Sequence, residues 1–207
     1  MTKIGLFPLS IVLLPNSTMA LYIFEERYKT LINECWENQK PFGIVLQLPN
    51  KNYKIGCTAF VADIMNVKPN GNLEILISGR NRFKIAKIYE NEAPYLVADV
   101  NWFDDKEEII DNELLGQALT IYNEIAQKVT EFKIPEIHID EITVNQPSFL
   151  IAQKSGLSIE ERQKLLEISS ENERLNTLLT HLKTIWPLIE KSEIIKILSK
   201  NDGYLII

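Results

Sequence analysis

The sequence predicts an α+β protein in which a β-rich half is followed by a helical half. Up to the acidic stretch 104–108, short apolar runs alternate with Pro, Gly and Asn, which is typical of strands joined by turns. Beyond that stretch, apolar residues recur at helical spacing. A chain of 207 residues accommodates one large domain or two small ones. We expect a β subdomain at 1–106 and a helical subdomain at 107–207.

The chain begins with an apolar segment that carries no charge between Lys3 and Glu25. A membrane span requires about 20 mostly apolar residues in unbroken helix, and Pro8 and Pro15 interrupt a helix. The same prolines disfavour a signal peptide, although an exported protein stays open as the alternative to a cytoplasmic one. We therefore predict strands at 4–7, 11–14 and 19–24.

One helix is predicted within the β half, at 25–38, because its apolar side chains form a single stripe that includes Cys35. The run Lys68-Pro69-Asn70-Gly71 has the composition of a hairpin turn, and Gly79 with Asn81 indicates a bulge or tight corner. Further strands are predicted at 42–48, 54–67, 73–78, 83–89 and 95–103. The pattern favours a mostly antiparallel barrel or sandwich with one inserted helix.

The helical half shows its own start and stop signals. An apolar face runs through 115–129, and Pro147 suits the first position of another helix. Two capping boxes are predicted, Ser158 with Glu161 and Ser170 with Glu173, and an apolar stripe covers 175–185. Asp202-Gly203 closes the last predicted helix before the apolar tail 204–207. The acidic stretch 104–108 is predicted to be a solvated connector.

Composition and charge exclude several functions. The net charge is −6 and the basic residues are scattered, which disfavours a nucleic-acid or anionic-membrane surface. With only Cys35 and Cys57 there is no disulfide framework. We expect two buried free thiols, with one bridge between them as the alternative.

No catalytic constellation is present in the sequence. There is no phosphate-binding loop and no Gly-x-Ser-x-Gly turn. His138 and His181 have no partners that complete a metal site, and Cys35 falls within an apolar stripe, where a nucleophile is disfavoured. We therefore expect no enzyme activity, no cofactor and no metal.

Motifs in both halves, taken in order, resemble the Lon substrate-binding (amino-terminal) domain family. In the first half they are LFPL at 6–9, VLLP at 12–15, LYIFEERY at 21–28, PFGIVL at 41–46, IGCTA at 55–59 and SGRNRF at 78–83. In the second half they are RQKLLE at 162–167 and ERL at 173–175. Two positions depart from the family pattern: Asn16 stands in place of Gly, and Ala20 in place of Pro.

The resemblance implies a PUA-like antiparallel β-barrel followed by a C-terminal helical bundle. It also implies a non-catalytic module that binds unfolded polypeptide or a partner protein in protein quality control, acting in some settings beside a separate protease. The chain contains no ATPase or protease domain, so it is expected to belong with the stand-alone members. The alternative is binding of nucleic acid, a nucleotide or a small anion by the barrel, which the acidic charge disfavours.

Two sets of residues are candidates for a site. Glu25, Arg27, Arg80 and Arg82 are expected to form either a structural ion pair that ties the helix to the sheet or an anion site.

The second set is apolar and is a candidate for polypeptide binding. Alternation in 96–102 assigns Leu96, Ala98, Val100 and Trp102 to the core. This leaves Phe103 on the other face, and the uncharged strand 19–24 has a similar excess in Met19 and Tyr22. Coverage of all three by the helical half is the alternative.

Overall fold

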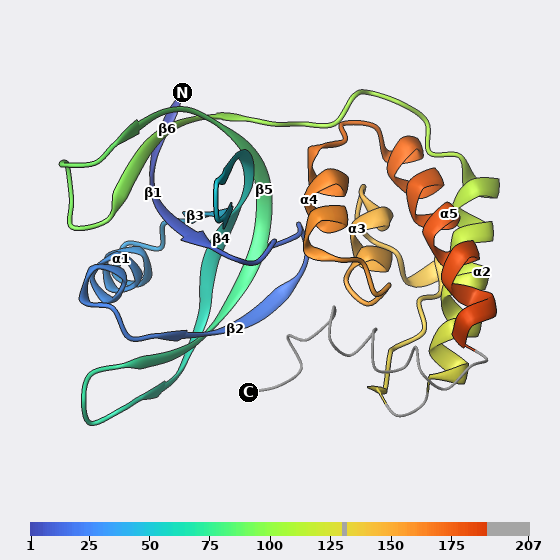
Figure 1. The fold of residues 1–207 in the computed structure, drawn as a ribbon, viewed down its shortest axis with the longest axis horizontal. Coiled ribbons are helices and arrows are strands. Elements are labelled where there is room, and N and C mark those ends of the chain that lie inside the picture. The colour runs from blue at the N-terminus through green and yellow to red at the C-terminus, as the bar shows by residue number, and fades with distance from the viewer. Residues whose placement is uncertain (130–131, 190–207) are drawn as a thin grey trace. The chain divides into compact units, whose positions relative to one another are not determined.

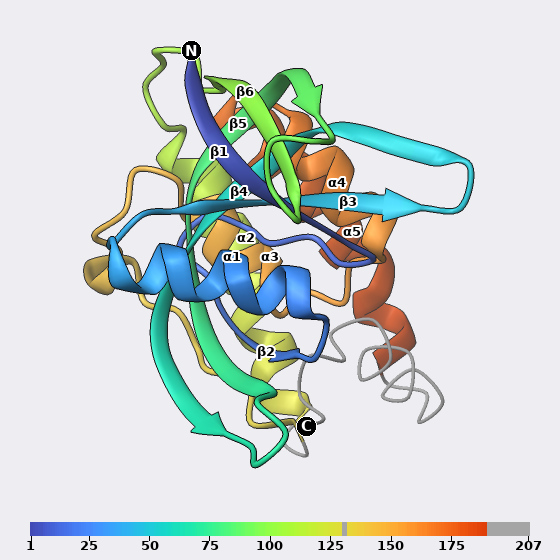
Figure 2. The ribbon, with the colours of Figure 1, turned by 90° about the vertical axis from the view of Figure 1, so that its left-hand side faces the viewer.

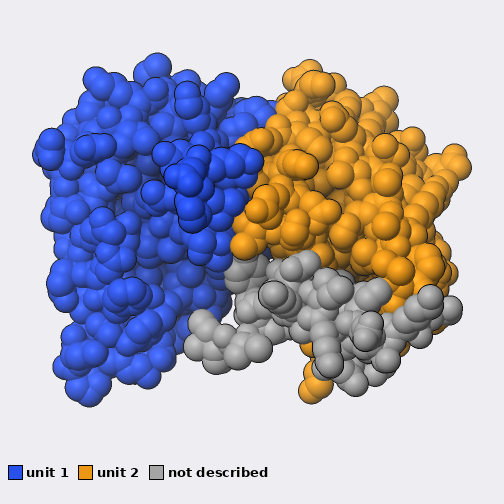
Figure 3. All heavy atoms as spheres, in the orientation of Figure 1, with its two compact units in different colours: residues 1–104 blue, residues 105–207 orange. Residues whose placement is uncertain are grey.

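The computed structural model describes residues 1–129 and 132–189 of the chain. The predicted helix end at Asp202-Gly203 and the predicted apolar tail at 204–207 lie outside these residues. Two compact units are present, residues 1–104 (unit 1) and residues 105–207 (unit 2), which Figure 3 shows in different colours. The division lies just before the boundary expected from the sequence.

Unit 1 contains six strands and one helix (Figure 1). Their bounds are β1 Thr2–Leu9, β2 Thr18–Ile23, α1 Glu26–Glu37, β3 Phe42–Leu48, β4 Lys51–Val67, β5 Leu73–Tyr89 and β6 Leu96–Trp102. The predicted turn at 68–71 is confirmed: Gly71 has a φ of 77°, and Lys68 N–H donates to the Asn72 carbonyl at 2.8 Å.

The strands form one sheet in the order β2-β5-β4-β3-β1-β6, and all neighbours are antiparallel except β1 and β3. Because β6 also pairs with β5, the strands β5, β4, β3, β1 and β6 are linked in a ring of pairings. β2 lies outside the ring and pairs with β5 alone. The predicted α+β class, with a mostly antiparallel sheet and one inserted helix, is confirmed.

Two predictions about strands in unit 1 are wrong. Residues 11–14 are not a strand, although Val12, Leu13 and Leu14 are buried, so this apolar run is a buried loop. The second error is the break predicted between 78 and 83, because β5 continues through it with a register shift against β4 near Ala59. Gly79 is needed there, since a Cβ would lie 2.3 Å from the Leu14 carbonyl oxygen.

The turn before β2 explains one departure from the family pattern. Asn16 has a φ of 60°, in the left-handed region. Asn tolerates this conformation better than most residues, so it replaces Gly without changing the path of the chain.

Helix α1 packs its predicted apolar stripe against the sheet, and Figure 2 shows it lying across the strands. The rings of Phe7 and Tyr28 stack with their centroids 3.9 Å apart, which joins β1 to the helix. Leu31 and Ile32 are buried beside them.

Unit 2 is helical. Its elements are α2 Asn112–Lys128, the short 3-10 helix η2 Ile139–Glu141, α3 Pro147–Ala152, α4 Ile159–Glu167 and α5 Glu171–Ile189. The capping box of Ser158 and Glu161 is confirmed. None of the helices within the described ranges is sufficiently long and apolar to span a bilayer.

Candidate functional site

Two exposed aromatic side chains stand at the end of β2. Tyr22 is 45% exposed, and Phe24, just after the last residue of the strand, is 62% exposed. Their ring centroids are 6.2 Å apart with an interplanar angle of 31°, which is within the range of attractive ring pairs. We call Tyr22 and Phe24 the aromatic pair.

Neighbouring groups hold the aromatic pair in place and balance the charge around it. The Asn72 side-chain amide donates to the Tyr22 hydroxyl at 2.6 Å, which anchors the ring to the β4–β5 hairpin. Directly after the pair, Glu25 forms an ion pair with Arg27, and Glu26 forms one with Lys29. The rings therefore offer apolar surface without a dominant charge of either sign beside it.

Two more exposed apolar side chains, Met65 and Val67, lie on β4 at the same end of the sheet. Asn66, between them, pairs with Glu74, which pairs in turn with Tyr22. Successive side chains of a strand point to opposite faces. Val67 pairs with Leu73, which pairs with Ile23, so Val67 lies on the opposite face of the sheet from Tyr22. The exposure of Phe24, Met65 and Val67 was not predicted from the sequence. Phe24 was available in the same uncharged run as Tyr22.

The free edge of β2 has none of the features that usually protect edge strands. Its sequence, TMALYI, contains no charge, no Pro and no Gly, and its register against β5 is continuous. Soluble proteins commonly protect edges with charges, prolines or bulges, because an unprotected edge can pair with another chain. Within the residues that the structure describes, β2 hydrogen-bonds to no other strand than β5.

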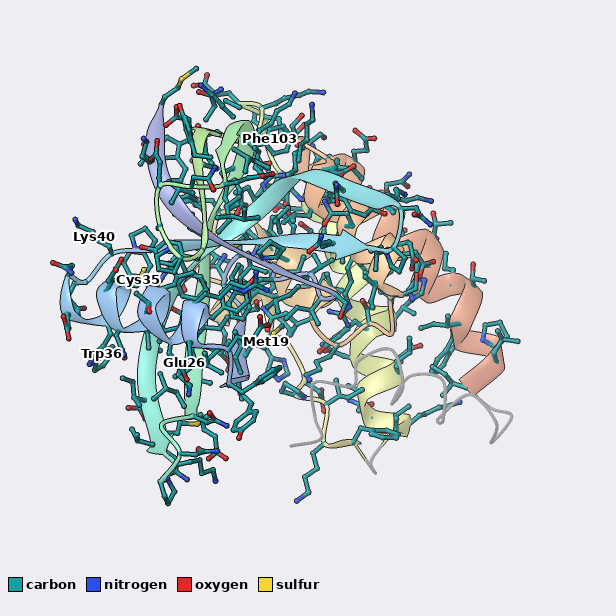
Figure 4. All side chains as sticks on the ribbon, turned by 60° about the vertical axis from the view of Figure 1, so that its left-hand side comes forward. Met19, Glu26, Cys35, Trp36, Lys40 and Phe103 are labelled. Carbon is teal, nitrogen blue, oxygen red and sulfur yellow. The ribbon has the colours of Figure 1, made fainter. Side chains whose placement is uncertain are left out.

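The structure separates the other two apolar candidates from Tyr22. Met19 is only 7% exposed, so the expectation that it offers surface is wrong: it points inward, opposite Ile77 in the register. Phe103 is half-buried, with the Arg82 guanidinium 4.7 Å from its ring centroid. Figure 4 shows Met19 and Phe103 at separate places, so they do not form one surface. A role for Phe103 in binding stays a prediction.

The assignment of β6 side chains to the core is correct for three of the four residues. Ala98 and Val100 are buried, and Leu96 packs against the cluster they form with Ile4 and Phe83. Trp102 is 45% exposed, so its assignment to the core is wrong. It pairs with Phe83 of that cluster, but it is the last residue of its strand and is not covered there.

The predicted charge cluster takes a different form. Glu25 pairs with Arg27 at 2.7 Å, and both are well exposed, so this pair does not tie α1 to the sheet as expected. The Arg27 guanidinium also lies over the Tyr28 ring. Arg82 is buried and Arg80 is exposed. We see no shared anion site formed by these side chains.

The thiols and imidazoles give no sign of catalytic chemistry. Cys35 and Cys57 are free and buried, as expected. Burial raises the pKa of Cys35 to about 11 and that of Cys57 to about 12, which disfavours the reactive thiolate. His181 lies 2.8 Å from the Ser155 carbonyl oxygen, which indicates a structural role. Across 1–129 and 132–189, no group of three or more His, Cys, Asp or Glu side chains could hold a metal ion.

In unit 2 the acidic connector is part of a buried polar network, so its description as merely solvated is wrong. Arg174 is fully buried, and its guanidinium donates to both Asp105 carboxylate oxygens, at 2.7 and 2.5 Å. Glu108 accepts hydrogen bonds from the Ser170 hydroxyl and the Asn172 N–H at the start of α5, which lowers the pKa of Glu108. The connector therefore fixes the beginning of α5.

Comparisons with known proteins agree with this architecture. Residues 3–184 match the family model described as the ATP-dependent protease La (LON) substrate-binding domain. The chain is 24% identical over 201 residues to the Lon protease of Dictyoglomus thermophilum, covering 91% of this chain and 24% of that protein. It is 28% identical over 185 residues to the Lon protease of Cytophaga hutchinsonii, covering 82% of this chain and 22% of that protein. The chain thus spans about a quarter of the length of these curated relatives.

Two solved structures are similar to this one. A Lon N-terminal domain protein from Xanthomonas campestris aligns with a TM-score of 0.68 and 25% identity, covering 87% of this chain and 98% of that one. The N-terminal domain of the Lon protease from Mycobacterium avium complex aligns with a TM-score of 0.70, covering 88% of this chain and 98% of that one. At 16% identity, the second likeness shows the fold alone.

Proposed function

Since the chain belongs to the family of the LON substrate-binding domain, as its sequence motifs predicted, we propose that it is a non-catalytic cytoplasmic module that binds unfolded polypeptide. The bound segment lies along the free edge of β2 and contacts the aromatic pair. A single observation carries this proposal: an uncharged edge strand ends in two exposed aromatic rings.

The strand edge explains how such a module tolerates many sequences. An extended segment that adds to a sheet edge forms main-chain hydrogen bonds, which do not depend on the side chains of the segment. Every polypeptide carries these groups, whereas a folded protein has already paired most of them. An edge therefore selects unfolded chain over folded chain.

The aromatic pair adds a preference for apolar side chains. A buried aromatic side chain removes about 150–250 Å² from water. With roughly half of each ring still exposed, full coverage contributes at most about 2–3 kcal/mol per ring, at 25 cal/mol per Å². The cost of association reduces this value, so we expect weak binding of one segment.

The experiment titrates a reduced, carboxymethylated model protein into the unchanged protein and into the double variant Tyr22→Ser/Phe24→Ser, and compares the two affinities. The double variant should bind at least about tenfold more weakly, a loss of about 1.4 kcal/mol, with its free energy of unfolding nearly unchanged. Trp102→Ser is the matched control, because Trp102 is as exposed as Tyr22 but lies at the end of β6. An equal loss in the control, or no loss in the double variant, would contradict the proposal.

The proposal also predicts no chemistry in this chain. The purified protein should neither hydrolyse ATP nor degrade casein, since its sequence carries no phosphate-binding loop. Turnover that a point substitution in this chain abolishes would refute the non-catalytic role.

A further inference from the structure

A hollow in unit 1 lies at the opposite ends of β4 and β5 from the aromatic pair. Its volume is about 230 Å³, and the side chains that matter for its chemistry are Leu6, Leu46, Gln47, Asn52, Ile88 and Glu90. We call it the mouth pocket.

The strand topology requires these residues to meet. β1 and β3 are parallel, so their carboxyl ends lie at the same end of the sheet, with Leu6 opposite Gly43 and Leu9 opposite Leu46. β4 is antiparallel to β3, so the first residues of β4 lie at this same end, with Asn52 opposite Gln47. β5 is antiparallel to β4, so the last residues of β5 lie at this end too. The ends of β1, β3 and β5 and the beginnings of β4 and β6 therefore form one rim of the ring of strands.

Two irregularities in the register occur at this rim. The β3–β4 register shifts between Val45 and Gln47, and the β5–β6 register shifts between Ile85 and Lys87. Bulges at barrel rims bend the strand and re-aim its side chains. Both shifts adjoin residues that line the pocket, so the local backbone is shaped around it.

The pocket has an apolar floor and a polar rim. Leu6 and Leu46 are buried, and Ile88 contributes an exposed apolar wall. At the rim, the side chains of Gln47, Asn52 and Glu90 make no hydrogen bond or ion pair with any residue in the described part of the chain. An apolar hollow with a few convergent polar groups is the usual composition of a binding site.

Size decides what the pocket can hold. Sites for drug-sized ligands and cofactors occupy about 300–1,000 Å³, and this one is smaller. We propose that the mouth pocket binds one bulky apolar side chain, such as Phe or Leu, of an extended polypeptide. The Gln47 and Asn52 amides hydrogen-bond to the backbone of that segment, and Glu90 favours a neighbouring Lys or Arg.

This inference rests on the proposed function and adds a second contact for the same unfolded chain. The 17 residues of β4 separate the two sites along the strand. A hexapeptide extends to only about 20 Å, so it reports on one site, whereas a long unfolded chain reaches both and gains avidity.

The test is an NMR titration of the full chain with acetyl-Gly-Ser-Phe-Lys-Ser-Gly-amide. Changes in NMR chemical shift should be concentrated at the backbone amides of Leu46, Gln47 and Asn52. Replacing Phe by Ser in the peptide should abolish these changes. Ile88→Glu should weaken binding at least about fivefold, since it places a charge in the apolar wall. Trp102→Glu is the matched control, because Trp102 and Ile88 are each 45% exposed on the same sheet and Trp102 does not line the pocket.

Charge provides a second readout. The Phe-Lys peptide should bind about two- to fivefold better than its Phe-Glu counterpart at low salt, the usual size of an exposed ion pair. Glu90→Gln should remove this preference. A preference that persists in Glu90→Gln would overturn the role of Glu90.

The outcomes separate this inference from the proposed function. If chemical-shift changes appear at Tyr22 and Phe24 instead, or if Ile88→Glu weakens binding no more than Trp102→Glu does, the mouth pocket is not a site. If the hexapeptide binds as described while Tyr22→Ser/Phe24→Ser still binds unfolded protein normally, the pocket stands and the proposed role of the aromatic pair fails.

Discussion

Replacing Arg174 by Met removes every hydrogen bond of a guanidinium that is fully buried in unit 2. A guanidinium has five N–H donors, and all five are used here. Nε donates to the Ser148 hydroxyl, Nη1 to Asp105 and to the Ile168 carbonyl, and Nη2 to Asp105 and Glu171. Met fills similar space but leaves the buried Glu171 carboxylate without its cation.

The magnitude follows from this loss. Removing one partner of a buried ion pair costs about 3–5 kcal/mol, a large share of the 5–15 kcal/mol that stabilises a typical domain. Unit 2 has about 100 residues, and the melting temperature of a domain of that size changes by about 4–8 °C per kcal/mol. A loss of 3 kcal/mol therefore lowers the melting temperature of unit 2 by at least about 12 °C. Arg174→Lys should not restore stability, because an ammonium cannot reproduce the planar fork.

The assay is urea unfolding followed by far-UV circular dichroism, which reports mainly on the helices of unit 2. The control is Arg27→Met, which removes an exposed pair with Glu25 and should cost about 0–1 kcal/mol. If Arg174→Met costs less than about 1 kcal/mol, the network does not stabilise unit 2, and the connector is the solvated segment that its composition suggests.

Three further predictions concern packing and titration. Gly79→Ala should cost about 1–3 kcal/mol in urea unfolding because its Cβ meets the loop before β2, whereas Gly116→Ala, with open space around its Cβ, should stabilise α2 by about 0.5–1 kcal/mol; equal effects would contradict the clash. Cys35 and Cys57, with pKa values raised to about 11 and 12, should resist iodoacetamide at pH 8 in native protein, as mass spectrometry would show. The pKa of Glu108 is lowered, so the ionised carboxylate stabilises the fold above its unfolded pKa of about 4.3. This stabilisation is lost as the pH falls through the folded pKa. Glu108→Gln should therefore reduce the loss of stability at acid pH, and an unchanged pH dependence would refute the role of Glu108 in stabilising unit 2.

Much of the fold could be predicted because it depends on local patterns. The helix at 25–38 and the strand at 42–48 carry the apolar spacing that their buried faces require, and the structure places α1 and β3 there. The capping box of Ser158 and Glu161 is likewise local, since both partners lie within one turn. Such features need no knowledge of distant contacts.

The errors arise where burial is decided by distant contacts. Residues 11–14 are as apolar as a strand, but they fill space as a loop beside β5. Asp105 reads as one of several surface acids, and its partner Arg174 is 69 positions away. Trp102 continues the alternation of β6 and pairs with the buried Phe83, but it is the last residue of the strand and stays 45% exposed.

The candidate site was predictable only in part, for the same reason. The uncharged strand 19–24 indicated an apolar excess, but alternation could not decide which face is covered. The structure buries Met19 and exposes Tyr22. Phe24 follows the strand, and its exposure depends on how the chain turns into α1.

Hydrogen exchange of the whole chain, with and without a saturating unfolded model protein, shows directly whether polypeptide adds to the edge of β2. A segment that adds to the edge of β2 protects backbone N–H groups that otherwise exchange with water. We expect the protection gained on binding to be concentrated in residues 18–24, and we expect Tyr22→Ser/Phe24→Ser to lose it. Protection confined to the helices α2–α5, with none gained in β2, would show that unfolded polypeptide does not bind at this edge.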